Sequence, residues 1–249
     1  MSCIVLRDMR LYAELKHVVQ REKAWAIRSY PCTGLGVWLQ PLISSTPIYQ
    51  EILHRAQSGE TIMDIGCFLG VDLRRLARDG APSNKLIGVD IVSHWDVGYF
   101  FFRDQDRFSG RFIEADLLRA DESPLAAMQG SVNVVSISLV LHQWNFETQR
   151  AACVQMTKLT NGPGALVLGF QCGTRTGTAG HGDPFNPEAF WHDEASMARC
   201  WDGVGGLTRT KWETRVELWD MTATGWKAED VAYLGEDVRL LHFIARRLE

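Results

Sequence analysis

The fold of this chain is decided by residues 61–75, TIMDIGCFLGVDLRR. The first apolar residues suit a strand buried on both faces, and Asp64 interrupts them near its carboxyl end, the edge at which open α/β sheets bind ligands. Gly66 and Gly70 allow a tight turn and a close approach of the backbone to a ligand. The residues from Asp72 onward begin a helix whose free amide groups face the same edge. We therefore predict the first strand, ligand loop and first helix of a nucleotide-type α/β fold; the alternative is a glycine turn that binds nothing.

Two ligand classes suit a loop of this kind, a dinucleotide and S-adenosylmethionine. A dinucleotide loop has the spacing G-x-G-x-x-G, so that the pyrophosphate sits on the helix terminus. Here the spacing is G-x-x-x-G, and Cys67 and Phe68 stand where a pyrophosphate needs bare backbone. Asp64 would repel two phosphates, whereas it gains a charge-assisted hydrogen bond from the ammonium group of a methionine. The loop favours S-adenosylmethionine, and a dinucleotide oxidoreductase is the weaker alternative.

Two further strand-like segments, residues 85–90 and 111–116, also end in an acid, Asp90 and Asp116. Because the carboxyl ends of parallel strands meet at one edge of a sheet, these acids are expected to share a crevice with the first. An acid at the end of the second strand binds the ribose hydroxyls of an adenosine ligand, and it lies about 20 residues beyond the glycine loop. Asp90 meets that spacing, and Ile91 is expected to pack on the adenine face.

The rest of the chain completes one sheet. The order of elements predicts an α/β, Rossmann-like fold with a seven-stranded, mostly parallel sheet and an antiparallel edge. We expect a single domain over residues 1–249, with a helical cap over residues 1–60 and a core over residues 61–249. The later elements are expected as strands at 131–139, 165–170, 211–219 and 238–245, and as helices at 146–159 and 196–201.

The cap is expected to form a lid or wall over the crevice, or alternatively a helical extension packed on the sheet edge. Residues 9–28 have amphipathic helical spacing, and Thr46 followed by Pro47 predicts the N-cap and first position of a helix over residues 48–56. A glycine-rich loop at residues 171–195 follows the fifth strand, where loops carry substrate specificity. The aromatic residues expected to hold an apolar small molecule are Tyr30, Trp38, Trp144, Phe185 and Trp191.

Three histidines are candidates for a general base: His142, His181 and His192. His142 follows the fourth strand at the active edge, but a histidine satisfied by hydrogen bonds is the alternative. The H-G-D run that begins at His181, together with His192, imitates a two-histidine, one-carboxylate iron site. That site belongs to jelly-roll oxygenases, so we expect no metal.

Charge and composition exclude several classes of protein. The net charge is −4 and no basic run is present, which disfavours nucleic acid as a partner. The start of the chain lacks the apolar core of a signal peptide, and no segment has the roughly 18 apolar residues of a membrane helix. The 6 cysteines include no C-x-x-C pair, which argues against zinc or a disulfide framework. We expect a soluble, intracellular protein, located in the cytoplasm.

The chain resembles class I S-adenosylmethionine-dependent methyltransferases, and among them the small fungal enzymes of meroterpenoid and related secondary-metabolite pathways. That family has patterns such as YPCIG, LDLGCCFGQDLR, D-G-x-P and F-I-x-A-D, followed by a late tract with N-P, R-H-D and T-G-T-x-W. The matching segments here are 30–32, 63–74, 79–82, 88–91, 96–99, 102–104, 112–116, 186–187, 192–193 and 208–212. Trp191 replaces the family's arginine before His192, and Arg209 replaces a glycine; both lie in the presumed substrate wall.

The resemblance implies roles for individual residues. Asp64 and Gly66 hold the methionine end, Asp90 the ribose, Ile91 the adenine face, and Asp116 with Leu117 the adenine amine. The cofactor site is expected to be completed by Cys67, Gly70, Ser138 and Leu139.

The resemblance also implies methyl transfer to oxygen, often to a carboxylate of a terpenoid-type metabolite. A phenol or alcohol acceptor needs a base, whereas a carboxylate does not. The main alternative is a protein of this fold that cyclises or isomerises a secondary metabolite without methyl transfer. A homodimer is left open.

Overall fold

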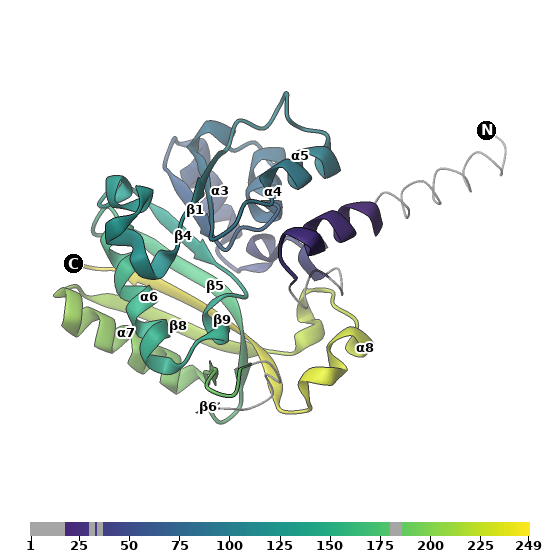
Figure 1. Ribbon diagram of the computed structural model, residues 1–249. Helices are drawn as coiled ribbons and strands as arrows, with labels where there is room; N and C mark the ends of the chain where they lie inside the picture. The colour runs from purple at the N-terminus through teal and green to yellow at the C-terminus, as the bar shows by residue number, and fades with distance from the viewer. Residues whose placement is uncertain (1–17, 30–32, 34–36, 180–185) are drawn as a thin grey trace.

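The computed structural model describes residues 18–29, 33, 37–179 and 186–249. A 7-stranded sheet has the order β3-β2-β1-β4-β5-β9-β8 (Figure 1). The first five strands are parallel, and β9 is antiparallel to both of its neighbours, so the expected mostly parallel sheet with an antiparallel pair at one end is confirmed. The strands of this sheet are β1 (Ile62–Ile65), β2 (Leu86–Asp90), β3 (Arg111–Glu114), β4 (Val134–Ile137), β5 (Leu166–Thr174), β8 (Trp212–Trp219) and β9 (Val238–Arg247).

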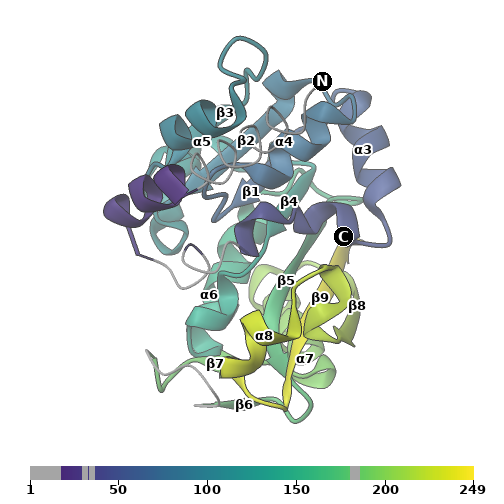
Figure 2. The ribbon, with the colours of Figure 1, turned by 90° about the vertical axis from the view of Figure 1, so that its right-hand side faces the viewer.

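Helices cover both faces of the sheet (Figures 1 and 2). They are α3 (Tyr49–Gln57), α4 (Val71–Arg78), α5 (Trp95–Phe102), α6 (Phe146–Leu159), α7 (Glu194–Thr208), α8 (Ala228–Val231) and a helix over residues 18–27. Ile62 packs with α3 and α4 on one face, and Met63 packs with α6 and α7 on the other. Because side chains alternate along a strand, Asp64 points to the same face as Ile62. In the described part of the chain, each helix is too short or too polar to cross a bilayer.

The cap reaches α3 through two short 3₁₀ turns, η1 (Val37–Leu39) and η2 (Leu42–Ser45). η2 contacts both α4 and β5, which places this part of the cap beside the start of the first core helix. The predicted N-cap role of Thr46 is wrong. Its Oγ1 lies 2.9 Å from Nε2 of His242 in β9, and α3 begins at Tyr49 without a side-chain cap. The hydroxyl therefore joins the cap to the sheet instead of starting a helix.

Two elements in the second half of the chain are longer than their sequence patterns predict. β5 continues to Thr174, because β9 pairs with it over its whole length. α7 spans Glu194–Thr208, begins with a capping box at Asp193, and runs through three glycines that obscured its length. A separate pair of short strands, β6 (Thr178–Ala179) and β7 (Phe190–Trp191), lies within the segment expected to be a loop.

Candidate functional site

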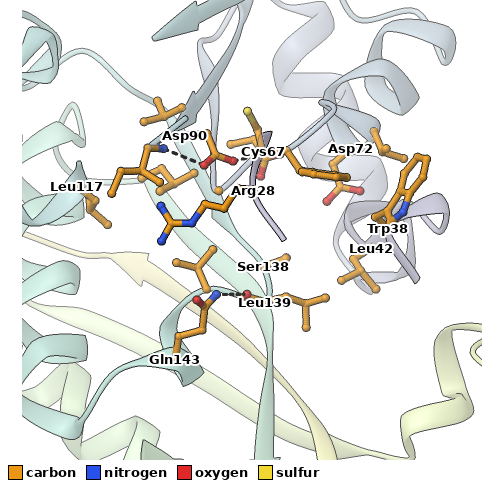
Figure 3. Close-up of a pocket in the computed structure, with 18 of the residues that line it drawn as sticks. Arg28, Trp38, Leu42, Cys67, Asp72, Asp90, Leu117, Ser138, Leu139 and Gln143 are labelled. Carbon is orange, nitrogen blue, oxygen red and sulfur yellow. Dashed lines mark hydrogen bonds between the residues drawn. The ribbon is translucent and has the colours of Figure 1, made fainter. Parts of the chain in front are cut away.

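A cavity of about 240 Å³ lies at the carboxyl ends of β1 to β4, next to the cap (Figure 3). All but one of the expected cofactor residues line it; the exception is Gly70. The residues of the sheet edge that line it are Asp64, Ile65, Gly66, Cys67, Phe68, Val89, Asp90, Ile91, Ala115, Asp116, Leu117, Ser138, Leu139, Val140, Gln143 and Trp144. The cap contributes Arg28, Trp38, Gln40 and Leu42, and α4 contributes Val71 and Asp72.

The loop between β1 and α4 is shaped by two glycines with left-handed backbone. Gly66 has a φ of +72°, and a Cβ at this position would lie 2.2 Å from Cγ2 of Val140. Gly70 has a φ of +69°, and its Cβ would lie 2.9 Å from the ring of Trp95. The backbone N–H groups of Gly66 and Cys67 donate to the carbonyl of Val89, at 2.8 and 3.1 Å. These contacts fix the loop against β2, so Gly70 shapes the site without facing the cavity.

Asp90 holds the loop and faces the cavity at once. One of its carboxylate oxygens accepts a hydrogen bond from the backbone N–H of Phe68 at 2.9 Å, and the other accepts one from Ile91 at 2.8 Å. Burial raises the pKa of Asp90, while these bonds oppose the rise. The next side chain, Ile91, lines the cavity and is 47% exposed, which suits a residue that a ligand covers.

Asp64 and Asp72 add two more acids to the same cavity. Burial, and next the charge of Asp72, raise the pKa of Asp64 well above its usual range, while a hydrogen bond from the Ser136 hydroxyl lowers it. Burial also raises the pKa of Asp72 to about 7, against the opposing hydrogen bonds from Ile43 and Leu42. The Ile43 N–H lies 3.2 Å from the Asp72 carboxylate. These two acids and Asp90, together with Asp116 on the same wall, favour a cationic ligand.

The turns after β3 and β4 contribute both polar and apolar residues to the cavity wall. Asp116 caps the turn that follows it by accepting from the Leu118 N–H at 2.9 Å, and Leu117 is buried beside it. Leu139 has a φ of +57°, and the Ser138 hydroxyl accepts from the Phe170 N–H at 3.2 Å. This arrangement brings the side chains of both turns to the cavity.

Two of the expected substrate aromatics line the cavity, Trp38 and Trp144. The ring of Trp38 packs edge-on against Phe68, with centroids 5.7 Å apart. Trp191 does not line the cavity: it is buried, and its indole N–H donates to the carbonyl of His142 at 3.2 Å. Its role is to support the turn after β4. Tyr30 and Phe185 lie outside the described residues.

Neither of the two candidate bases that the structure describes, His142 and His192, lines the cavity. Nδ1 of His142 is 3.3 Å from Oε1 of Gln171, and the residue does not line the cavity. His192 is buried with Nδ1 3.0 Å from the Ser196 hydroxyl, and burial lowers its pKa to about 4. A buried, neutral His192 fastened to α7 is poorly placed to act as a base here. His181 lies outside the described residues, and the described part of residues 171–195 contributes nothing to the cavity wall.

The described residues contain no group of three or more His, Cys, Asp or Glu side chains that could hold a metal. Burial raises the pKa of the Cys67 thiol well above its usual range, so this cysteine is a neutral part of the wall and not a nucleophile. Sequence reasoning missed Arg28 and Asp72 as cavity residues, because Arg28 belongs to no recognisable motif and Asp72 was expected only at the start of a helix.

The fold is that of S-adenosylmethionine-dependent methyltransferases. Magnesium protoporphyrin IX methyltransferase from Synechocystis, solved with bound S-adenosylhomocysteine, superposes with a TM-score of 0.53 at 17% identity, covering 85% of this chain and 84% of that one. No family model matches the chain.

Two relatives identify the family. The O-methyltransferase atr3 of Stereocaulon alpinum is 36% identical over 90% of this chain, which spans 66% of that protein. The methyltransferase adrK of Penicillium roqueforti is 32% identical over 90% of this chain and 82% of its own length. The chain belongs to this family of fungal secondary-metabolite methyltransferases.

Proposed function

We propose that this protein binds S-adenosylmethionine in the cavity and transfers its methyl group to an oxygen atom of an apolar small molecule of secondary metabolism. The observation that carries the proposal is the gathering of Asp64, Asp72 and Asp90 around one cavity, each with a pKa raised by burial. The sulfonium and ammonium groups of the cofactor provide the positive charge that this cluster demands.

The roles of the individual residues follow from their positions. Asp90 is suited to the ribose hydroxyls, because its two oxygens offer about four acceptor positions and the backbone N–H groups of Phe68, Ile91 and Val92 leave part of this capacity free. Ile91 and Leu117 provide apolar surface for the adenine ring. Asp64 and Asp72, near the start of α4, are suited to the cationic methionine end.

The reaction itself is an in-line displacement at the methyl carbon. The protein accelerates it by holding the acceptor oxygen, the methyl group and the sulfur in line, and by excluding water. Trp38 and Leu42 give the cap side of the cavity an apolar wall, and Trp144 adds apolar surface from the turn after β4. We propose that the cap closes this side, as a lid over the crevice.

The acceptor that fits best is a carboxylate, giving a methyl ester. The described part of the cavity wall contains no histidine, and His142 is engaged with Gln171. An acceptor that is already ionised needs no base, whereas a phenol does. The name of the relative atr3, an O-methyltransferase, also supports transfer to oxygen.

The test is calorimetric titration of ligand-free protein with S-adenosylmethionine, S-adenosylhomocysteine and a nicotinamide dinucleotide. We expect micromolar binding of the first two alone. Incubation with methyl-labelled S-adenosylmethionine and aromatic or terpenoid carboxylic acids should then give base-labile labelled esters. Failure of both adenosyl ligands to bind would refute the proposal. Cofactor binding with a product of unchanged mass would instead support the cyclisation or isomerisation alternative.

A further inference from the structure

Arg28 has no place in the roles described so far. It follows the helix over residues 18–27, and its backbone N–H donates to the carbonyl of Ala24 at 3.1 Å. Figure 3 shows its guanidinium reaching from the cap towards the middle of the cavity, between Asp90 and Gln143. Among the residues that the structure describes, it is the one lysine or arginine that lines this cavity.

The helix that carries Arg28 is fixed to the cofactor loop. Ala24 is fully buried, and its backbone lies close enough to His94 to oppose the lowering of that histidine's pKa by burial. The ring of His94 packs against Phe68 of the loop, with centroids 4.5 Å apart. Arg28 is close enough to His94 for its charge to lower the pKa of that histidine, although burial is the larger cause. The end of the helix is thus placed at the cavity by tertiary packing.

The other charges of the cavity give Arg28 a chemical task. Asp64, Asp72, Asp90 and Asp116 all line the wall, and those of them that are ionised repel a carboxylate brought in by a ligand. A ligand that carries both a cation and a carboxylate needs a compensating positive group for its negative end. A guanidinium suits this task because its planar donors match the two oxygens of a carboxylate.

We propose that Arg28 is the carboxylate-binding residue of this cavity. The inference rests on the proposed function, in which two carboxylates are available: the α-carboxylate of S-adenosylmethionine and the carboxylate of the acceptor. Arg28 binds one of them through paired N–H donors. Because it is carried on the cap, this contact also joins the cap to the bound ligand.

The first arm of the test compares ligands that differ only in the carboxylate. Dissociation constants of S-adenosylmethionine and decarboxylated S-adenosylmethionine are measured by calorimetry for the wild type, Arg28→Gln and Arg28→Lys. If Arg28 binds the carboxylate of the cofactor, Arg28→Gln raises the dissociation constant of S-adenosylmethionine about tenfold or more. It changes the dissociation constant of the decarboxylated ligand less than about twofold. Arg28→Lys should recover part of the loss, because the charge remains but the paired donors do not.

The second arm tests the acceptor as the source. With S-adenosylhomocysteine bound, binding of 1-naphthoic acid and 1-naphthamide is followed by tryptophan fluorescence. Arg28→Gln should then remove the preference for the acid over the amide, while the affinity for S-adenosylmethionine is unchanged.

Lys23→Gln is the matched control for both arms. It removes one positive charge from the helix that precedes Arg28, and Lys23 lies over the ring of Phe100 without lining the cavity. The control should bind every ligand as the wild type does.

The proposal is overturned if Arg28→Gln weakens binding of each carboxylate ligand and of its counterpart without the carboxylate equally. It is also overturned if Arg28→Gln changes the binding of none of the four ligands. Wild-type protein that binds no S-adenosylmethionine would refute the proposed function instead, so the two failures can be told apart.

Discussion

Replacement of Asp90 by Asn is the sharpest test of the cofactor site, because the side chain keeps its shape and loses its charge. In the wild type both carboxylate oxygens accept backbone hydrogen bonds, from Phe68 at 2.9 Å and Ile91 at 2.8 Å. An Asn side chain has a single acceptor oxygen, so its NH₂ group must face one of these two donors. We therefore expect some loss of loop order as well as of ligand affinity.

The expected magnitude follows from these contacts. A hydrogen bond to a charged group contributes about 1.5–3 kcal/mol, so loss of the charged acceptor facing the ribose should weaken S-adenosylhomocysteine about ten- to hundredfold. The unpaired backbone N–H adds about 1–3 kcal/mol of destabilisation to the fold itself. Calorimetry measures the first effect and thermal unfolding measures the second.

Glu114→Gln is the control for Asp90→Asn. Glu114 pairs with Asp90 in the β2–β3 register, but its side chain is exposed and does not line the cavity. It should change neither affinity nor stability appreciably. Wild-type affinity in a folded Asp90→Asn variant, or an equal loss in both variants, would refute the assignment of Asp90 to the ribose.

Three other predictions concern the same cavity. The pKa of Asp72 is about 7 in the ligand-free protein, so affinity for S-adenosylmethionine should rise as pH increases through 7, with proton release near pH 6 in paired calorimetry buffers. Affinity that does not change with pH would count against the binding of a cation by Asp64, Asp72 and Asp90. The same raised pKa means that protonated Asp72 contributes to the free energy of unfolding, and this contribution is lost as pH rises through about 7. Gly66→Ala should abolish cofactor binding and lower the melting temperature more than Gly59→Ala does, because a Cβ at Gly66 meets Val140 at 2.2 Å whereas one at Gly59 meets nothing within 4 Å; equal shifts would contradict this. His142→Ala should leave the rate on a carboxylate acceptor nearly unchanged, and a rate loss of about 10²-fold or more would indicate an acceptor that needs a base.

The acids at the carboxyl edge of the sheet were predictable from the sequence, because the local pattern of each strand and the parallel order of the strands place them together. Asp64, Asp90 and Asp116 each end a strand, and parallel pairing of β1, β2 and β3 brings these ends to one edge. No long-range packing detail is needed to place them. The glycine spacing was equally informative, since Gly66 requires a positive φ and has no room for a side chain.

The substrate side was less predictable because tertiary packing decides it. Trp191 and His192 have the composition of a binding loop, yet β7 and the start of α7 bury both of them. Arg28 is an ordinary residue at a helix end, and it becomes a cavity residue only through the docking of Ala24. Whether these side chains are buried or line the cavity depends on which surfaces pack together, and the spacing of residues in the sequence does not show that.

The position of β9 has a consequence for how a nascent chain acquires its final form. β9 is made after β8 but lies between β5 and β8, so β8 has no partner strand until β9 has been made, and it joins the rest of the sheet only through β9. The bond between Thr46 and His242 ties the cap to the same late strand. Contacts between residues so distant in sequence form slowly, because the entropy of closing a long loop is lost before the contacts contribute any stabilisation. We expect pulse-labelled hydrogen exchange to protect β8 no earlier than β9, with β1 to β4 protected first; early protection of β8 would contradict this order.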